Sequence, residues 1–105
     1  MSIPEKDWKA LRKHLPDWQE AYIEKKLQEY QEIIQRGGSS AVRFWELDKR
    51  MKADKKLTGV VVTDMRRSTA VFTIASLAEC GAISDEDLSV FTEETRERVR
   101  DILSL

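Results

Sequence analysis

The chain has 105 residues, of which 18 are Lys or Arg, 19 are Asp or Glu and 41% are hydrophobic, and its formal net charge is −1. These proportions supply enough apolar side chains for one core and enough charge for a hydrated surface. They predict a single helical domain over residues 1–105 and exclude a disordered chain. The longest stretch without a charged residue, residues 68–78, is 11 residues long, whereas a membrane-spanning helix needs about 20, so we expect no membrane contact.

The cellular compartment is predicted from two further features. Cys80 is the single cysteine and cannot form an intramolecular disulfide. The first residues lack the basic and then apolar pattern of a secretory leader. Both features predict a cytoplasmic protein.

Two helices are expected before residue 37. The first is predicted to begin at Pro4 and to end at Pro16, because an internal proline lacks an N–H group and restricts the residue before it. The second is predicted to run from Pro16 to the glycines at 37 and 38, which can adopt the left-handed conformation of a helix end. Its apolar residues follow helical spacing: Trp18, Tyr22, Ile23, Leu27, Tyr30, Ile33 and Ile34.

A third helix is expected after Ser39 or Ser40, either of which can cap its N-terminus. Its charged face ends in a basic tail over residues 49–56, as suits the negative end of a helix dipole. Its apolar side chains are Val42, Phe44, Trp45, Leu47 and Met51.

The segment of residues 58–80 has two interpretations. Its valines and threonines favour strands, and a hairpin of residues 60–63 with residues 70–74 is conceivable. However, the intervening residues have no Gly, Asn or Pro for a tight turn, and no third strand is apparent. Because residues 60–80 contain neither Gly nor Pro and are followed by Gly81, we expect one long helix that is apolar nearly all round.

A last helix is expected after Ser84, with Asp87 completing a capping box. The whole sequence therefore predicts an all-α fold: a compact bundle of four to five helices around a long central helix at about residues 58–80. The predicted core is formed by Trp8, Trp18, Tyr22, Leu27, Tyr30, Phe44, Leu47, Met51, Met65, Phe72, Leu88, Phe91 and Val99.

No catalytic or metal site is expected. His14, the single histidine, lies at a predicted helix end, where capping of carbonyl groups is its common role. Cys80 lies near the negative end of a helix, which disfavours a reactive thiolate. One His and one Cys do not supply a zinc site, and phosphate-binding glycine motifs are missing. We therefore expect a protein that is not an enzyme and needs no cofactor or metal.

The charges are unevenly distributed and suggest a partner. Residues 1–40 have a net charge of 0, residues 41–67 of +4, and residues 68–105 of −5. Complementary regions of this kind can face each other or a second copy. Asp64, Arg66 and Arg67 interrupt the apolar segment, either as its exposed stripe or as a surface for a protein partner. The leading hypothesis is a self-associating interaction protein.

The alternative hypothesis is a nucleic-acid-associated regulator that uses the basic segment 43–67. Its candidate phosphate contacts are Lys49, Arg50, Lys52, Lys55 and Lys56. Residues 75–90 have the layout of a helix-turn-helix, but Asp85, Glu86 and Asp87 would begin its second helix and would repel DNA. Nucleic acid is therefore the less favoured partner.

Four segments resemble a group of small bacterial proteins of uncharacterised role, some of which carry the label multidrug transporter. They are residues 6–9 (KDWK), 17–22 (DWQEAY), 44–56 (FWELDKRMKADKK) and 80–88 (CGAISDEDL). The resemblance implies no catalytic residues. We take the transporter label as unreliable, because this sequence has no apolar stretch long enough to span a membrane.

Overall fold

The computed structural model describes residues 2–105, and those residues contain helices and no strand. Four α-helices are present, namely α1 (Glu5–Gln35), α2 (Ser40–Asp54), α3 (Ala70–Glu79) and α4 (Glu93–Leu103). Two short 3₁₀ helices, η1 (Arg67–Thr69) and η2 (Asp87–Val90), precede α3 and α4. The all-α prediction is therefore confirmed.

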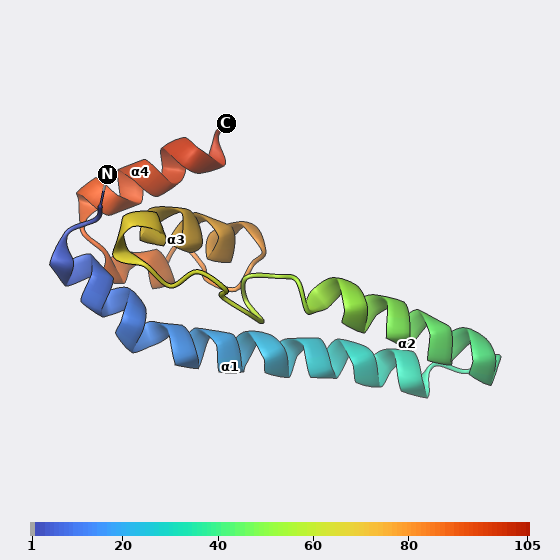
Figure 1. The fold of residues 1–105 in the computed structure, drawn as a ribbon. Helices are drawn as coiled ribbons and strands as arrows, with labels where there is room; N and C mark the ends of the chain where they lie inside the picture. The colour runs from blue at the N-terminus through green and yellow to red at the C-terminus, as the bar shows by residue number, and fades with distance from the viewer. Residues whose placement is uncertain (1) are drawn as a thin grey trace.

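The helices form two regions of different shape (Figure 1). The first half of α1 packs with α3, η2 and α4 into what we call the body. The second half of α1 continues away from the body and turns back as α2, and we call this hairpin, residues 23–56, the arm. The molecule therefore measures 51 × 23 × 22 Å, and its radius of gyration is 16.2 Å, compared with roughly 13 Å for a compact chain of this length.

The body contains the main hydrophobic core. Apolar side chains from the first half of α1, from α3 and from the segments around η2 and α4 meet there. The buried members are Ile3, Leu11, Leu15, Trp18, Ala70, Val71, Ile74, Ala75, Leu77, Ile83, Leu88, Phe91 and Val99. Since α3 is apolar on most of its surface, it occupies the centre of the body, as expected for a helix of this composition.

A buried carboxylate joins the two ends of the chain inside the body. Asp7 is 0% exposed. Its Oδ1 accepts a hydrogen bond from the Thr92 backbone N–H at 2.9 Å, and its Oδ2 accepts from the hydroxyls of Thr92 at 2.6 Å and Thr95 at 2.5 Å. These bonds offset the cost of burying the carboxylate and fix the start of α4 against α1.

The predicted helix over residues 58–80 is wrong in its first half, because the helix begins only at Ala70. Gly59 packs against the ring of Tyr22, so closely that an added Cβ would lie 2.5 Å from a ring carbon. Arg66 has extended backbone angles of φ −125° and ψ 145°. The valines and threonines that follow Gly59 restrict their own side-chain rotamers in a helix and favour this extended path. The long helix of this protein is α1, with 31 residues.

The predicted break at Pro16 is also wrong, because α1 contains Pro16 in its interior. Proline removes one backbone hydrogen bond and kinks a helix, and α1 is bent within its first half (Figure 1). The side chains of Leu11, Leu15 and Trp18 are buried in the core on both sides of the proline. This packing holds the two helical segments together.

Several predicted chain reversals are confirmed. The Ser39 hydroxyl accepts a bond from the Val42 N–H, and Gly38 and Gly81 have φ of 104° and 84°. Ser84 and Asp87 exchange side-chain and backbone bonds as a capping box does. However, the predicted last helix is interrupted there, since this box starts only η2 and α4 begins at Glu93.

The predicted core is correct for five residues in and beside the body, but Phe72 of α3 is exposed, and no predicted core residue of the arm is fully buried. Trp18, Tyr22, Leu88, Phe91 and Val99 are buried, whereas Trp8, Tyr30 and Leu47 are half-buried. The predicted core residues that are exposed instead are Leu27, Phe44, Met51, Met65 and Phe72. Three of these five belong to the arm, which has one helix layer and therefore leaves one side of each helix uncovered.

Candidate functional site

An apolar stripe follows the outer half of α1. Ile23, Leu27, Tyr30 and Ile34 are spaced by four, three and four residues, which places them on one side of the helix. Leu27 and Ile34 are each 52% exposed. The same spacing is found in helices that pack along a seam against a partner helix.

A matching stripe follows α2. Phe44, Leu47 and Met51 are spaced by three and four residues, and Phe44 is 63% exposed. One shallow groove between the helices is lined by Ile23, Leu27, Tyr30 and Met51, and a second by Ile34, Phe44 and Leu47. The two stripes therefore lie on the same side of the hairpin. We call the surface formed by these seven residues the arm face.

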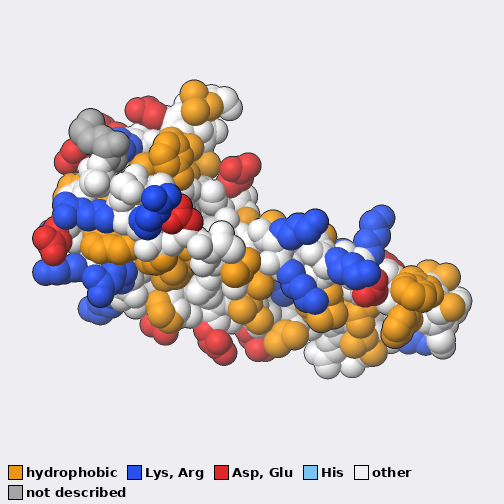
Figure 2. Space-filling model, viewed as in Figure 1, with side chains coloured by type: hydrophobic (Ala, Val, Ile, Leu, Met, Phe, Trp, Pro, Cys, Tyr) orange, Lys and Arg blue, Asp and Glu red, His pale blue; other side chains and the backbone are white. Residues whose placement is uncertain are grey.

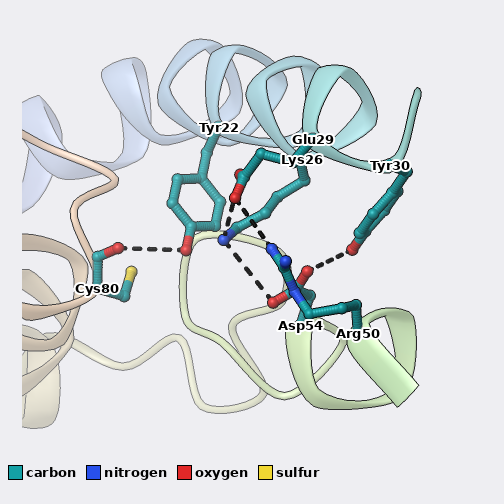
Figure 3. Close-up of polar contacts among 7 residues, drawn as sticks. All are labelled: Tyr22, Lys26, Glu29, Tyr30, Arg50, Asp54 and Cys80. Atoms are coloured by element: carbon teal, nitrogen blue, oxygen red, sulfur yellow. Dashed lines mark hydrogen bonds and ion pairs between the residues drawn. The ribbon is translucent and has the colours of Figure 1, made fainter. Parts of the chain in front are cut away.

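The two helices of the arm are held together mainly by polar contacts (Figure 3). Tyr30 donates a hydrogen bond to Asp54 Oδ2 at 2.5 Å, and Lys26 Nζ lies 3.7 Å from Asp54 Oδ1. Arg50 donates to Glu29 at 2.9 Å. Ile33 is the fully buried aliphatic side chain of this hairpin. Ile23, Tyr30 and Leu47 are half-buried, so one arm covers its apolar stripes only in part.

The pKa values of this cluster follow from burial and from its charges. Burial, together with the hydrogen bond to Asp54, raises the pKa of Tyr30 to about 12. Burial lowers the pKa of Lys26, but the nearby Tyr22, Asp54 and Glu29 outweigh that effect, so its pKa is raised overall. The cluster therefore favours a protonated tyrosine and a protonated lysine around the buried Asp54 carboxylate.

The tip of the arm is fixed by two arginines. Arg36 donates to both carboxylate oxygens of Glu46, at 2.8 and 3.0 Å. Arg43 donates to the carbonyl of Ile34 in the last turn of α1 and to the hydroxyl of Ser40. These contacts satisfy a carbonyl at the end of α1 and hold the two helix ends together.

The two edges of the arm face differ in charge. Glu24 and, one turn nearer the body, Glu20 lie on the edge of α1 that faces away from α2. Along α2, Lys52 pairs with Asp48 on the outer edge, and Lys55, the C-cap of α2, lines the groove beside Ile23 and Leu27. Both glutamates and both lysines are exposed. Figure 2 shows apolar side chains between the two helices and out to the tip, with Lys and Arg gathered over α2.

The predicted partner-binding residues lie outside the arm, in the loop before α3. Asp64 and Arg66 form a two-point ion pair at 2.6 and 2.8 Å, which lowers the pKa of the Asp64 carboxyl. Arg67 instead donates to the backbone carbonyl of Ile3 at 2.9 Å. Asp64 thus pairs with Arg66 and not with Arg67 as a helix would require. Their role in partner binding stays a prediction.

The predicted phosphate-contacting residues occupy α2 and the two positions after it. Arg50 is turned toward Glu29, whereas Lys49, Lys52, Lys55 and Lys56 are exposed. Lys52 also pairs with Asp48 at 3.0 Å. The structure therefore brings four of these five cations to the surface.

His14 and Cys80 have ordinary structural surroundings. His14 stacks on the ring of Trp18 with 5.4 Å between ring centroids. The Cys80 thiol lies 3.5 Å from the Leu77 carbonyl. Within residues 2–105, His, Cys, Asp and Glu form no group of three that could hold a metal ion. Among those residues there is also no helix with the length and hydropathy needed to cross a bilayer.

Sequence reasoning missed the arm face as a surface. The helical spacing of both stripes is visible in the sequence, but the prediction places Leu27 and Phe44 in the core and assigns Ile34 to no surface. The one signal for exposure was the short glycine turn at residues 37 and 38. It pairs the outer half of α1 with α2 and carries most of their length away from the rest of the described chain, while Val60 of the following loop reaches the groove at its body end.

Comparisons with protein-family models, with curated proteins and with solved structures gave no match.

Proposed function

We propose that this protein is a non-enzymatic interaction protein that self-associates through the arm face. The observation that carries the proposal is the continuous apolar surface of seven residues on the arm, three of which are more than half exposed. A helix normally buries its apolar stripe against another layer of structure. Within residues 2–105, Val60 reaches the groove beside Ile23 and Leu27, whereas the groove beside Ile34 and Phe44 is lined by residues of the arm itself.

The energetics of the arm support the same proposal. Burying apolar surface contributes roughly 25 cal/mol per Å², and the arm gains little of this contribution from Ile33 alone. Exposed ion pairs such as Arg36–Glu46 add about 0–1 kcal/mol each. If another apolar surface covered the arm face, apolar burial would stabilise the arm more than it does in a single copy.

The test compares two substitutions on α2. Phe44 lies on the arm face, and Val42 lies on the opposite side of the helix, with exposed fractions of 63% and 64%. Both positions are in the first turns of α2, so a glutamate has a similar effect on the helix dipole at each. Sedimentation velocity at tens of micromolar should show a self-associated wild type, a monomeric Phe44→Glu variant and a self-associated Val42→Glu variant.

Two results would contradict the proposal. A wild-type protein that sediments as a strict monomer removes self-association. Equal dissociation by Val42→Glu and Phe44→Glu removes the arm face as the contact surface. Circular dichroism of both variants confirms that each remains helical.

We propose further that the protein works without cofactor or metal and resides in the cytoplasm. The support for the cytoplasm is the single, half-buried Cys80, since oxidising compartments favour paired cysteines. Reaction of Cys80 with a maleimide reagent in intact and lysed cells, with and without prior oxidation, tests whether the thiol stays reduced.

A second candidate function, a nucleic-acid-associated regulator, is favoured by one row of side chains. Trp45, Lys49, Lys52 and Lys56 are spaced by four, three and four residues along one side of α2 and the turn that follows it, and all are exposed. Lysines bind phosphates, and an exposed tryptophan can stack on a base. This row faces away from α1 and lies beside the arm face.

Fluorescence anisotropy with labelled single-stranded RNA and duplex DNA tests the second candidate. Binding should weaken steeply with salt and should be reduced by Lys49→Glu with Lys56→Glu. The control variant is Lys6→Glu with Lys13→Glu, which changes the charge equally on exposed positions of the body. Equal binding by both variants, or no salt dependence, would discard nucleic acid as a partner.

A further inference from the structure

Two copies of a two-helix hairpin can cover their apolar faces in two symmetric ways. In the first, the twofold axis runs along the arm, so α1 of one copy lies on α2 of the other and both tips point the same way. In the second, the axis runs across the arm, so α1 lies on α1 and α2 on α2, with the tips pointing in opposite directions. Each gives four helices around one shared core, the arrangement of a four-helix bundle.

The charges along the edges distinguish these two arrangements. An axis along the arm brings Glu20 and Glu24 of each copy beside Lys52 and Lys55 of the other. An axis across the middle of the arm reverses the second copy end for end, so Glu20 and Glu24 of one copy lie beside the tip end of the other copy's α1, away from Lys52 and Lys55. The basic edges of the two α2 helices then run side by side. Opposite charges at an interface favour one register, and like charges facing each other disfavour the alternative.

The positions of the apolar residues along the long axis of the arm also fit the first arrangement. Lys26 contacts Asp54 and Glu29 contacts Arg50, which fixes the positions of α1 and α2 that lie level with each other. Leu27 and Met51 line one groove, and Ile34 and Phe44 line the other. Rotation about an axis along the arm does not change the position of a residue along that axis. Leu27 therefore faces the second copy's Met51, and Ile34 faces the second copy's Phe44.

The position of the body is compatible with this geometry. In Figure 1, α3 and α4 lie on the same side of α1 as α2 does. Rotation about an axis along the arm therefore places the second copy's α3 and α4 on the opposite side. The two bodies are then at the same end of the assembly but on different sides of it.

We propose that the occupant of the arm face is a second copy of this chain, with its arm parallel to the first, its α1 on the first copy's α2 and its acidic edge on the first copy's basic edge. This inference rests on the proposed self-association and adds the pairing of helices to it. It also assigns Glu20, Glu24, Lys52 and Lys55 as the residues that select the parallel arrangement.

The experiment uses single-cysteine variants of the full chain in which Cys80→Ser removes the native thiol. Leu27→Cys, Met51→Cys and Ile34→Cys proteins are prepared, one member of each mixture carrying a tag that changes its gel mobility. Oxidation of the Leu27→Cys and Met51→Cys mixture should give a disulfide-linked heterodimer. The mixture of Leu27→Cys and Ile34→Cys proteins should remain unlinked. Both positions lie on α1, and in the parallel arrangement the α1 helices of the two copies do not face each other.

The outcomes separate the inference from the proposed function. A link between Leu27→Cys and Ile34→Cys, or a dimer in which neither mixture links, overturns the parallel pairing and leaves self-association standing. A wild-type monomer in sedimentation velocity overturns both. A link restricted to Leu27→Cys with Met51→Cys supports the pairing.

Charge reversal supplies an independent measurement that does not depend on cysteine chemistry. Glu24→Lys and Lys55→Glu should each weaken dimerisation by roughly two- to fivefold, and the chain that carries both should recover the wild-type dissociation constant. Because Lys55 also lies near Ile23 and Leu27 of its own chain, the two single variants are also mixed. A parallel heterodimer of Glu24→Lys and Lys55→Glu chains restores opposite charges between the copies, whereas residues 24 and 55 within each chain keep like charges. If the double variant is weaker than either single variant, the parallel pairing is wrong.

Discussion

The body and the arm are built from the same kind of amphipathic helix, yet they use it differently. In the body, several elements cover α3, and side chains such as Ile74 are completely buried. In the arm, one helix pairs with one helix through a polar cluster, and the apolar stripes remain at the surface. An apolar stripe in the sequence shows that one side of a helix is suited to burial. Whether the same chain buries that side depends on how many neighbouring helices pack against it.

The largest expected effect comes from removing side-chain volume in the body. Ile74→Ala should lower the free energy of unfolding by about 2–5 kcal/mol, because Ile74 is 0% exposed and its loss leaves a cavity. Leu27→Ala in the arm should cost less than about 1 kcal/mol at protein concentrations too low for association, since half of that side chain is already in water. Urea denaturation of both variants measures the contrast.

Equal costs for Ile74→Ala and Leu27→Ala would contradict this view of the two regions. It would mean that the arm face is as well covered as the core of the body. Repeating the measurement at tens of micromolar sharpens the comparison, because the cost of Leu27→Ala should then increase with association.

A smaller effect is expected at the junction of the two regions. Gly59→Ala should cost about 1–3 kcal/mol, because its Cβ would approach the Tyr22 ring to 2.5 Å and force a shift. Gly37→Ala is the control, since a Cβ there meets nothing within 4 Å. Thermal unfolding should show a lower melting temperature for Gly59→Ala alone, and an equal change in both variants would refute the tight contact.

The smallest effect concerns the polar cluster of the arm. Tyr30→Phe should cost about 1 kcal/mol at neutral pH, as is typical of a lost hydrogen bond. The pKa of Tyr30 is raised to about 12 from its ordinary value of 10.0. The raised pKa therefore contributes stability that is fully present below pH 10 and is lost as the pH rises toward 12.

The pH dependence of Tyr30→Phe checks this assignment. Urea denaturation measures the free energy of unfolding at pH 9 and at pH 11.5. The decrease between these two pH values should be smaller for Tyr30→Phe than for the wild type. Ultraviolet absorption of the phenolate should show the wild-type tyrosines ionising later in the folded than in the denatured protein. An unchanged pH dependence in Tyr30→Phe would refute the role of its hydroxyl.

The sequence was sufficient for the fold class and for most helix ends. Local signals determine these features, and Ser39, Gly38 and Gly81 act within a few residues of their own position. Residues 58–69 were misassigned because their path depends on Gly59 meeting Tyr22, a contact between residues far apart in the sequence. Absence of Gly and Pro within a segment permits a helix but does not require one.

The candidate surface was only half predictable. Helical spacing identified Leu27 and Phe44 as apolar positions of their helices, but spacing does not say what lies opposite. Pro16 was expected to separate two helices, and that expectation hid the single long α1 that carries the arm away from the body. The opposite charges of the two edges could be recognised only once the helices were placed side by side.

The bonds from Asp7 to Thr92 and Thr95 have a consequence for the order in which a growing chain can fold. They join residues 85 and 88 positions apart, so the body closes only after residue 95 has left the ribosome. The polar contacts between the two helices of the arm join residues no more than 28 positions apart, such as Lys26 and Asp54, and all of them are available once residue 56 has emerged. If the arm face pairs two copies as proposed, two nascent chains on one messenger can meet through their arms before either body has formed.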